Sequence, residues 1–335
     1  MTSAAHDHHS HAHPHPEHGS AVDPAPQSLT IWSPAGVVAQ PAALRRAARH
    51  LQKLGFAVDI DPAAAARSQR FAGDDDTRLA ALHRIADAQP DVALGSRGGY
   101  GLTRLLDRID WARVGRSVDA GTRWVGFSDH TALHNAALAH KAIGADAPMW
   151  AGPHACEDFG PAAGSSAVDD VTEACFVEAM HGELEAVGFR EAAALRSEAG
   201  FDGLQANGTL WGGNLCVLVS LLGTPHFPRV RGGVLFLEDV SEHPYRVERM
   251  LLQLHQAGVL DAQKAIVLGA FSDWKRSPLD RGYTLKSAIE HLRGRTATPI
   301  LAGLPFGHVP TKVCLPVGRK ITLAVDRRDV LLHWG

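Results

Sequence analysis

In the first half of the chain, short apolar runs alternate with segments whose apolar residues have helical spacing. The short runs predict four strands, at 29–32, 57–60, 91–94 and 123–127. Apolar residues three or four positions apart predict two amphipathic helices, at 41–54 and 77–88. Strands and helices that alternate in this way are typical of an α/β domain with a mainly parallel sheet. We expect folded structure to begin near Leu29.

The second half continues this alternation after a change in composition at 157–166, which is rich in Gly, Pro, Ala and Ser. A helix that bridges two domains is predicted at 171–180. Further apolar runs predict three strands, at 234–239, 265–269 and 320–325. Helical spacing of apolar residues predicts one amphipathic helix, at 245–254. We expect Trp211-Gly212-Gly213-Asn214 to form a glycine turn before a buried helix. The predicted division is an N-terminal domain, a linker and a C-terminal domain, at 28–155, 156–200 and 201–335.

The first twenty residues hold seven of the 20 histidines and lack core-forming apolar residues. Such a stretch cannot offset the entropy of ordering, so residues 1–27 are expected to be a disordered His-rich tail. Two interpretations stay open: the imidazoles bind metal ions, or the tail is solvated and takes no part in the chemistry. The histidines are His6, His8, His9, His11, His13, His15 and His18.

The charge balance excludes several classes of partner. The chain has 335 residues, with 33 basic against 36 acidic side chains and a net charge of −3. No basic field indicates nucleic acid, and no basic amphipathic segment indicates a membrane surface. No apolar run is long enough for a transmembrane helix, and no apolar leader is visible. The four cysteines, which form no CxxC pair, are Cys156, Cys175, Cys216 and Cys314. A cytoplasmic location is expected.

Two chemically unusual segments, 95–101 and 126–133, follow predicted strands, where ligands of parallel sheets collect. The first has four glycines in seven positions, but position 104 is Arg, so it is no dinucleotide fingerprint. No P-loop is present either, and we expect no cofactor. The segment is either a tight strand-to-helix turn or a set of backbone N–H donors for an anion.

Ser128 lies between a predicted strand and a predicted helix. It is either a nucleophile on a strained turn or a helix N-cap, and the G-x-S-x-G pattern fails because position 130 is His. Glu238 ends an apolar strand, where an unpaired carboxylate is costly. It either forms a salt bridge with Arg246 or Arg249, or orients His308 as a general base. His308 could also be an ordinary loop residue.

No compact metal-binding spacing occurs in the folded part, so no metal site is expected there.

Taken together, these segments resemble the LD-carboxypeptidase family of serine peptidases, the muramoyltetrapeptide carboxypeptidases. The resemblance covers the chain from about Leu29 to its end. The matching segments, in family order, are Ser96–Gly101, Gly126–Leu133, Trp211–Leu215, Leu235–Val240, Tyr245–Met250 and Gly307–Pro310. The His-rich tail is absent from the family pattern.

This resemblance implies a flavodoxin-like parallel-sheet domain, a swivelling β/α domain and an active site between them. It also implies a homodimer. The nucleophile falls on Ser128, the acid on Glu238 and the base on His308. The backbone oxyanion donors fall on Asp129 and Gly99.

The resemblance implies release of the terminal D-alanine from muropeptide tetrapeptides in peptidoglycan recycling. Two alternatives stay open: an amidase like the microcin C immunity proteins, acting on a toxic aminoacyl-nucleotide, and a non-catalytic muropeptide- or nucleotide-binding module. Trp211 could stack on a nucleobase or belong to the core. Arg97 and Arg246 are candidates for the substrate carboxylate. The full set of candidate substrate contacts is Arg97, Tyr100, Trp211, Asn214 and Arg246.

Overall fold

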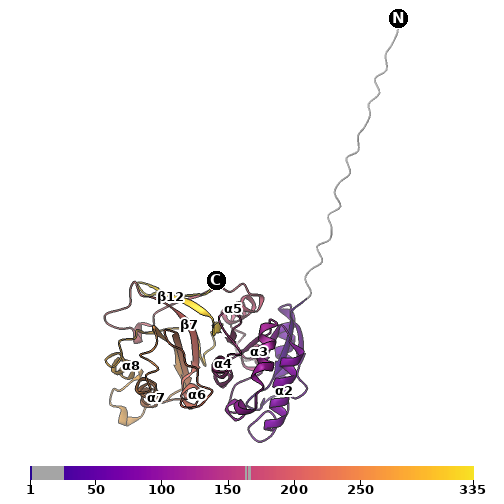
Figure 1. Cartoon of the computed structure of the whole chain (residues 1–335), viewed down its shortest axis with the longest axis horizontal. Coiled ribbons are helices and arrows are strands. Elements are labelled where there is room, and N and C mark those ends of the chain that lie inside the picture. Colours follow the sequence, from indigo (N-terminus) through magenta and orange to yellow (C-terminus); the bar gives the residue numbers. More distant parts are fainter. Residues whose placement is uncertain (2–25, 163, 165–166) are drawn as a thin grey trace.

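The computed structural model describes residue 1, residues 26–162, residue 164 and residues 167–335. Within these residues, a pair of β-sheets lie side by side, each flanked by helices (Figure 1). The predicted α/β fold is therefore confirmed. The histidines of the predicted tail lie outside the described residues. None of the helices in the described residues combines the length and hydrophobicity needed to cross a lipid bilayer.

The first sheet has the strand order β2-β1-β3-β4-β5, all parallel, which is the flavodoxin-like order. A sixth strand from the C-terminal half of the chain, β11, pairs antiparallel with β5 at the edge. The strands of the first sheet are β1 (Ser28–Trp32), β2 (Ala57–Ile60), β3 (Val92–Gly95), β4 (Arg123–Gly126), β5 (Met149–Ala151) and β11 (Leu315–Val317). All four strands predicted in the first half of the chain are confirmed.

The helices of this half begin where local signals indicate. Asp74 and Asp110 each accept a hydrogen bond from a first-turn N–H group, which caps α2 and α3. The buried face of α1 is apolar, as the helical spacing predicts. The helices are α1 (Ala42–Lys53), α2 (Asp75–Ala88), η1 (Leu102–Arg104), η2 (Leu106–Arg108), α3 (Trp111–Asp119), α4 (His130–Ala139), the π-helix η3 (Ala155–Phe159) and α5 (Asp170–His181).

The second sheet has the order β10-β9-β8-β7-β12-β13-β6, parallel from β10 to β7 and antiparallel beyond. Its strands are β6 (Ala186–Arg190), β7 (Gln205–Asn214), β8 (Val234–Val240), β9 (Ala265–Ser272), β10 (Ile300–Ala302), β12 (Lys320–Asp326) and β13 (Asp329–His333). Its helices are η4 (Ala193–Leu195), α6 (Leu215–Ser220), α7 (Pro244–Gln256), η5 (Pro278–Asp280) and α8 (Leu285–Arg293).

The glycine turn predicted at 211–214 is wrong, because these residues are the end of strand β7. They pair in parallel register with β8, which brings Asn214 opposite Glu238. Gly212 and Gly213 have φ of +124° and +127°, a backbone conformation that favours glycine. A Cβ atom on Gly213 would lie 2.4 Å from Thr131 Oγ1 of α4. The glycines therefore serve close packing within a strand.

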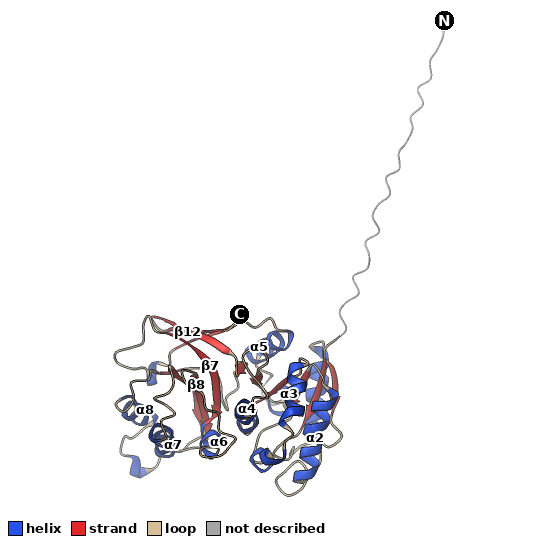
Figure 2. Cartoon of the chain, in the orientation of Figure 1, coloured by secondary structure: helices blue, strands red, loops and turns tan. Residues whose placement is uncertain are grey.

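The segment 156–200, expected to be a linker, contains the predicted helix as α5 and also strand β6. In Figure 2, α4 lies between the two sheets. It contacts β5 of the first sheet and β7 of the second. The turn that precedes α4 is therefore held where the two sheets meet.

Candidate active site

Ser128 lies on the sharp turn between β4 and α4. Its φ of +60° is unusual for a residue other than glycine. The N-cap of α4 is Asp129, so the N-cap interpretation of Ser128 is wrong. The Ser128 hydroxyl is instead 3.1 Å from Nε2 of His308, a residue 180 positions further along the chain. This geometry matches a strained turn that presents a serine hydroxyl at the end of a strand.

Glu238 is fully buried near the end of β8. Its Oε2 atom is 2.9 Å from Nδ1 of His308, and its Oε1 atom accepts a hydrogen bond from the Asn214 side chain. Asn214 also donates to Asp239, so one amide holds two adjacent carboxylates. Arg246 pairs with Glu242 instead, and the salt-bridge interpretation of Glu238 is not supported. The buried carboxylate is satisfied by an imidazole and an amide.

His308 lies in the predicted loop, between β10 and β11. Burial by itself lowers the pKa of His308, but the hydrogen bond to Glu238 and the charges of Glu238, Glu157 and Asp239 outweigh it and raise the pKa. One ring nitrogen faces the carboxylate and the other faces the serine hydroxyl. A neutral imidazole donating from Nδ1 to Glu238 would thus accept a proton at Nε2.

The glycine-rich segment after β3 packs directly on this turn. Gly98 is so close that a Cβ atom there would lie 2.8 Å from Ser128 Cβ. The Asp129 carboxylate accepts a 2.7 Å hydrogen bond from the Leu102 N–H group, which ties the segment to the turn. Burial raises the pKa of Asp129 to about 6. Within the described residues, the N–H groups of Gly99 and Asp129 have no hydrogen-bond acceptor, so both are free to bind an anion.

A cavity of about 680 Å³ opens beside Ser128. Gly99, Tyr100 and Asp129 line it near the serine, and η1, η2 and α6 form its walls. A second cavity of about 540 Å³ is lined by His308 and Phe127. The serine and the histidine therefore each face an open space large enough for part of a ligand.

The candidate substrate contacts lie in different places. Tyr100 is exposed and lines the cavity, whereas Asn214 is buried and holds the carboxylates. Arg97 is half-buried, donates to the Val37 carbonyl and pairs with Glu157.

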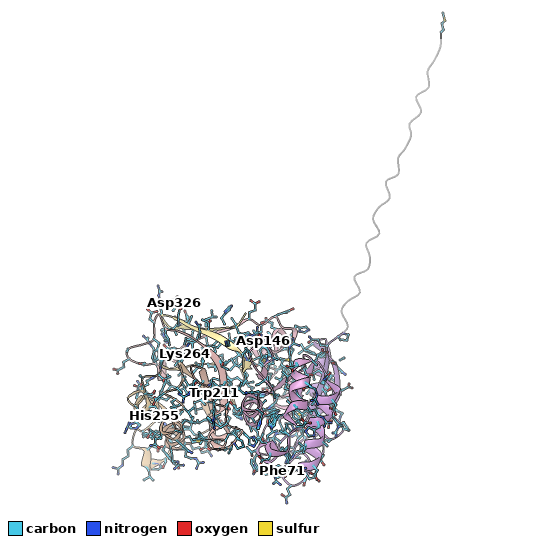
Figure 3. All side chains as sticks on the ribbon, in the orientation of Figure 1. Phe71, Asp146, Trp211, His255, Lys264 and Asp326 are labelled. Carbon is cyan, nitrogen blue, oxygen red and sulfur yellow. The ribbon has the colours of Figure 1, made fainter. Side chains whose placement is uncertain are left out.

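Two of these candidates require correction. Trp211, which is labelled in Figure 3, is fully buried in the core of the second sheet. Its indole N–H group donates to Gln263, and its ring packs edge-to-face on Phe227. It is therefore a core residue. Arg246 is exposed on α7, pairs with Glu242 and lines neither cavity.

Two residues near the site escaped the sequence analysis. His154 is fully buried, accepts a hydrogen bond from the Phe127 N–H group and pairs with Glu157. The Thr131 hydroxyl on α4 accepts a hydrogen bond from the Asn214 N–H group at the end of β7. His154 follows β5, a three-residue strand beside β4. The rule that ligands collect at strand ends would have found it if β5 had been recognised.

Within the described residues, no group of three or more His, Cys, Asp or Glu side chains is arranged to hold a metal ion.

Comparison with known proteins gives consistent results for both halves. Residues 29–145 match the model of the LD-carboxypeptidase N-terminal domain, and residues 207–323 match that of the C-terminal domain. The chain is 30% identical over 319 residues to a probable murein peptide carboxypeptidase of Bacillus subtilis, covering 92% of this chain and 94% of the relative.

Solved structures show the same fold. The muramoyltetrapeptide carboxypeptidase from Oxalobacter formigenes superposes with a TM-score of 0.81 at 36% identity, over 92% of this chain and 98% of that chain. The microcin C7 self-immunity protein MccF, in complex with aspartyl sulfamoyl adenosine, has a TM-score of 0.76 at 19% identity, over 92% and 96%. At 19% identity, the likeness to MccF shows only that the two chains share a fold.

Proposed function

This chain belongs to the LD-carboxypeptidase family, and we propose that it is a serine peptidase that releases the terminal D-alanine from muropeptide tetrapeptides. One observation carries the proposal. His308 lies between the Ser128 hydroxyl and the Glu238 carboxylate, with hydrogen-bond distances of 3.1 and 2.9 Å. A nucleophile, a base and an orienting acid in this order are the elements of acyl-enzyme catalysis.

The first half of the reaction forms the acyl-enzyme. Ser128 attacks the carbonyl carbon of the scissile amide while Nε2 of His308 takes the hydroxyl proton. The Glu238 carboxylate stabilises the resulting imidazolium through Nδ1–H. The N–H groups of Gly99 and Asp129 bind the oxyanion. His308 then gives its proton to the amine of D-alanine, which leaves, and the peptide remains as an ester on Ser128.

The second half releases the peptide. A water molecule gives a proton to His308 and attacks the ester, and the same N–H groups bind the second oxyanion. His308 returns the proton to Ser128, which restores the free enzyme. None of these steps uses a metal ion or cofactor.

The relatives support a murein substrate. The names of the B. subtilis and O. formigenes proteins are those of a murein peptide and a muramoyltetrapeptide carboxypeptidase. The microcin-type alternative rests on a likeness of fold. Trp211, the side chain that could have stacked on a nucleobase, is buried. A role in peptidoglycan recycling, a cytoplasmic location and a homodimer belong to the same proposal.

The direct test is incubation with a disaccharide-tetrapeptide, followed by mass analysis. We expect the unaltered enzyme to remove one alanine from the tetrapeptide and Ser128→Ala to remove none. Ser197→Ala, which changes a serine outside the site, should remove the alanine as completely as the unaltered enzyme does. A covalent adduct should form on Ser128 when a slow acylating peptide ester is used. If the tetrapeptide stays intact, or if Ser128→Ala still cleaves it, the proposal is wrong.

A further inference from the structure

The proposed mechanism requires Ser128 and His308 to stay within hydrogen-bond distance, although they come from opposite halves of the chain. Ser128 lies on the turn between β4 and α4, and His308 lies in the loop between β10 and β11. Within the described residues, no backbone hydrogen bond joins this turn to this loop. The 3.1 Å distance between the Ser128 hydroxyl and the His308 ring therefore depends on side chains that connect the two segments.

His154 connects the Ser128 turn to the π-helix η3. Its Nε2 atom accepts a 3.2 Å hydrogen bond from the N–H group of Phe127, the residue before Ser128. Its Nδ1 atom is 2.9 Å from the Glu157 carboxylate, so the ring proton is on Nδ1 and Nε2 is an acceptor. The backbone N–H group of His154 donates over 2.7 Å to Oδ2 of Asp158. Because His154 is fully buried, water cannot take over these hydrogen bonds.

Lys312 connects Asp158 to the His308 loop. Its Nζ atom is 2.7 Å from Oδ1 of Asp158 and donates to the carbonyl of Val309, the residue after His308. The same Nζ atom lies 5.3 Å from the centre of the Phe127 ring. The side chains of Asp158 and Lys312 are only 9% and 5% exposed. A continuous path of buried polar groups therefore runs from Phe127 to Val309.

The centre of this path requires a carboxylate. Asp158 accepts from the His154 N–H group with one oxygen and from Lys312 with the other. An amide has a single oxygen, so asparagine could accept from only one of these two donors. A buried ion pair adds little stability, because the cost of desolvation offsets the attraction between the charges. The arrangement is better suited to holding two segments in one geometry.

We propose that Asp158 and Lys312 are positioning residues that set the separation of Ser128 and His308. They act through the backbone groups at the two ends of the path, next to the reacting side chains. When the path is cut, the loop can move relative to the turn, and the hydrogen bond between Ser128 and His308 lengthens. The inference rests on the proposed function, because it assumes that a proton passes from Ser128 to His308.

The test removes both charges and nearly preserves the side-chain volumes. In the double variant Asp158→Asn with Lys312→Met, no buried charge lacks a partner, so melting should occur within about 4 °C of the unaltered protein. The path is cut, however, and kcat for D-alanine release should fall about tenfold, with KM within about threefold. A displacement of one ångström would cost about 100-fold, but Thr172 of α5 still holds the Pro310 carbonyl and the backbone N–H of residue 312.

The single variant Lys312→Met separates positioning from stability. It leaves Asp158 as a buried charge without its ion-pair partner, so both the melting temperature and kcat should decrease. Adding Asp158→Asn should restore the melting temperature but not kcat. If kcat returns together with the melting temperature, the ion pair serves folding alone and the inference is wrong.

A second variant applies if the double variant does not fold. Asp158→Asn keeps the size of the side chain and one of its two hydrogen bonds, and it should lower kcat about tenfold. If this variant keeps its kcat, the inference is wrong whatever the double variant does. Asp61→Asn with Arg84→Met is the matched control, because Asp61 is similarly buried and its ion pair lies beside β2, at the opposite edge of the first sheet from β5. It should leave kcat unchanged.

Labelling of Ser128 by a fluorophosphonate separates this inference from the proposed function, because it requires His308 beside Ser128 but no muropeptide. The labelling rate should fall about tenfold in the double variant. An unaltered enzyme that leaves the tetrapeptide intact, with labelling that slows in this way in the double variant, would overturn the function and support the inference. Cleavage by the unaltered enzyme, with equal labelling rates in both proteins, would do the reverse. Absence of labelling in the unaltered enzyme would overturn both.

Discussion

Replacing Gly98 with alanine tests whether the contact between the glycine-rich segment and the nucleophile turn matters for catalysis. Gly98 is buried, and its φ lies outside the left-handed region, so alanine is acceptable to the backbone. The new Cβ atom, however, would lie 2.8 Å from Ser128 Cβ and 2.9 Å from Ser128 Oγ. Since carbon atoms in contact are about 3.5 Å apart or more, the two segments must separate by roughly 0.7 Å.

Either way of separating them damages the site. If Ser128 moves, its 3.1 Å hydrogen bond to His308, already long for such a bond, lengthens further. If the glycine-rich segment moves, the N–H group of Gly99 moves with it. A displacement of this size in reacting groups costs about 100-fold in rate. We therefore expect kcat to fall about 100-fold, with a loss of about 1–3 kcal/mol in the free energy of unfolding from overpacking.

The assay measures D-alanine release and the rate at which a fluorophosphonate labels Ser128. Both rates should fall together, while thermal melting shows that the protein is folded. Gly144→Ala is the matched control, because a Cβ atom at Gly144 would have no neighbour within 4 Å. It should leave kcat unchanged. A folded Gly98→Ala variant whose kcat is within twofold of the unaltered enzyme would refute this reasoning.

Four further predictions concern the site and its electrostatics. Ser128→Ala and His308→Ala should each lower kcat by about 10⁴-fold or more, Glu238→Ala by less, and the Ser128–His308 double variant no further than Ser128→Ala. Multiplicative losses in the double variant would contradict the shared role. Glu238→Gln should move the acidic limb of the kcat/KM profile to lower pH, because the Glu238 charge raises the pKa of His308, which must be neutral to act as a base; an unmoved limb would contradict this. Burial raises the pKa of Asp129 from 3.8 to about 6, so its contribution to stability should decrease as the pH rises through this interval. Urea unfolding at pH 4 and pH 7 measures the free energy of unfolding, and Asp129→Asn should lack the part of its decrease that Asp129 causes. If the free energies of the unaltered protein and Asp129→Asn differ by the same amount at both pH values, the prediction is wrong. Exhaustive treatment with EDTA should leave turnover unchanged, whereas activity that is lost and then restored by zinc would overturn the serine mechanism.

Local patterns in the sequence were sufficient for much of the first domain. Short hydrophobic runs predicted β1 to β4. In β3 and β4 these runs are nearly continuous, because buried parallel strands are apolar on both faces, whereas the edge strand β2 is largely exposed. Helical spacing predicted α1 and α2. The strand-end rule then directed attention to the glycine-rich segment and to Ser128. The strand β5, with three residues, was too short to give a signal, and His154 was missed with it.

The candidate site as a whole depended on tertiary structure. Glu238 and His308 were ambiguous as single residues, and the resemblance to a family supplied the expectation that they act together. Packing of the two sheets against α4 brings His308 to Ser128 across 180 residues. Pairing with β8 made 211–214 the end of a strand, and Trp211 is buried in the second sheet's own core. Periodicity reports only which face of a local element is apolar. Which elements become neighbours, and thus which side chains meet, is decided by strand pairing and close packing over long separations in the sequence.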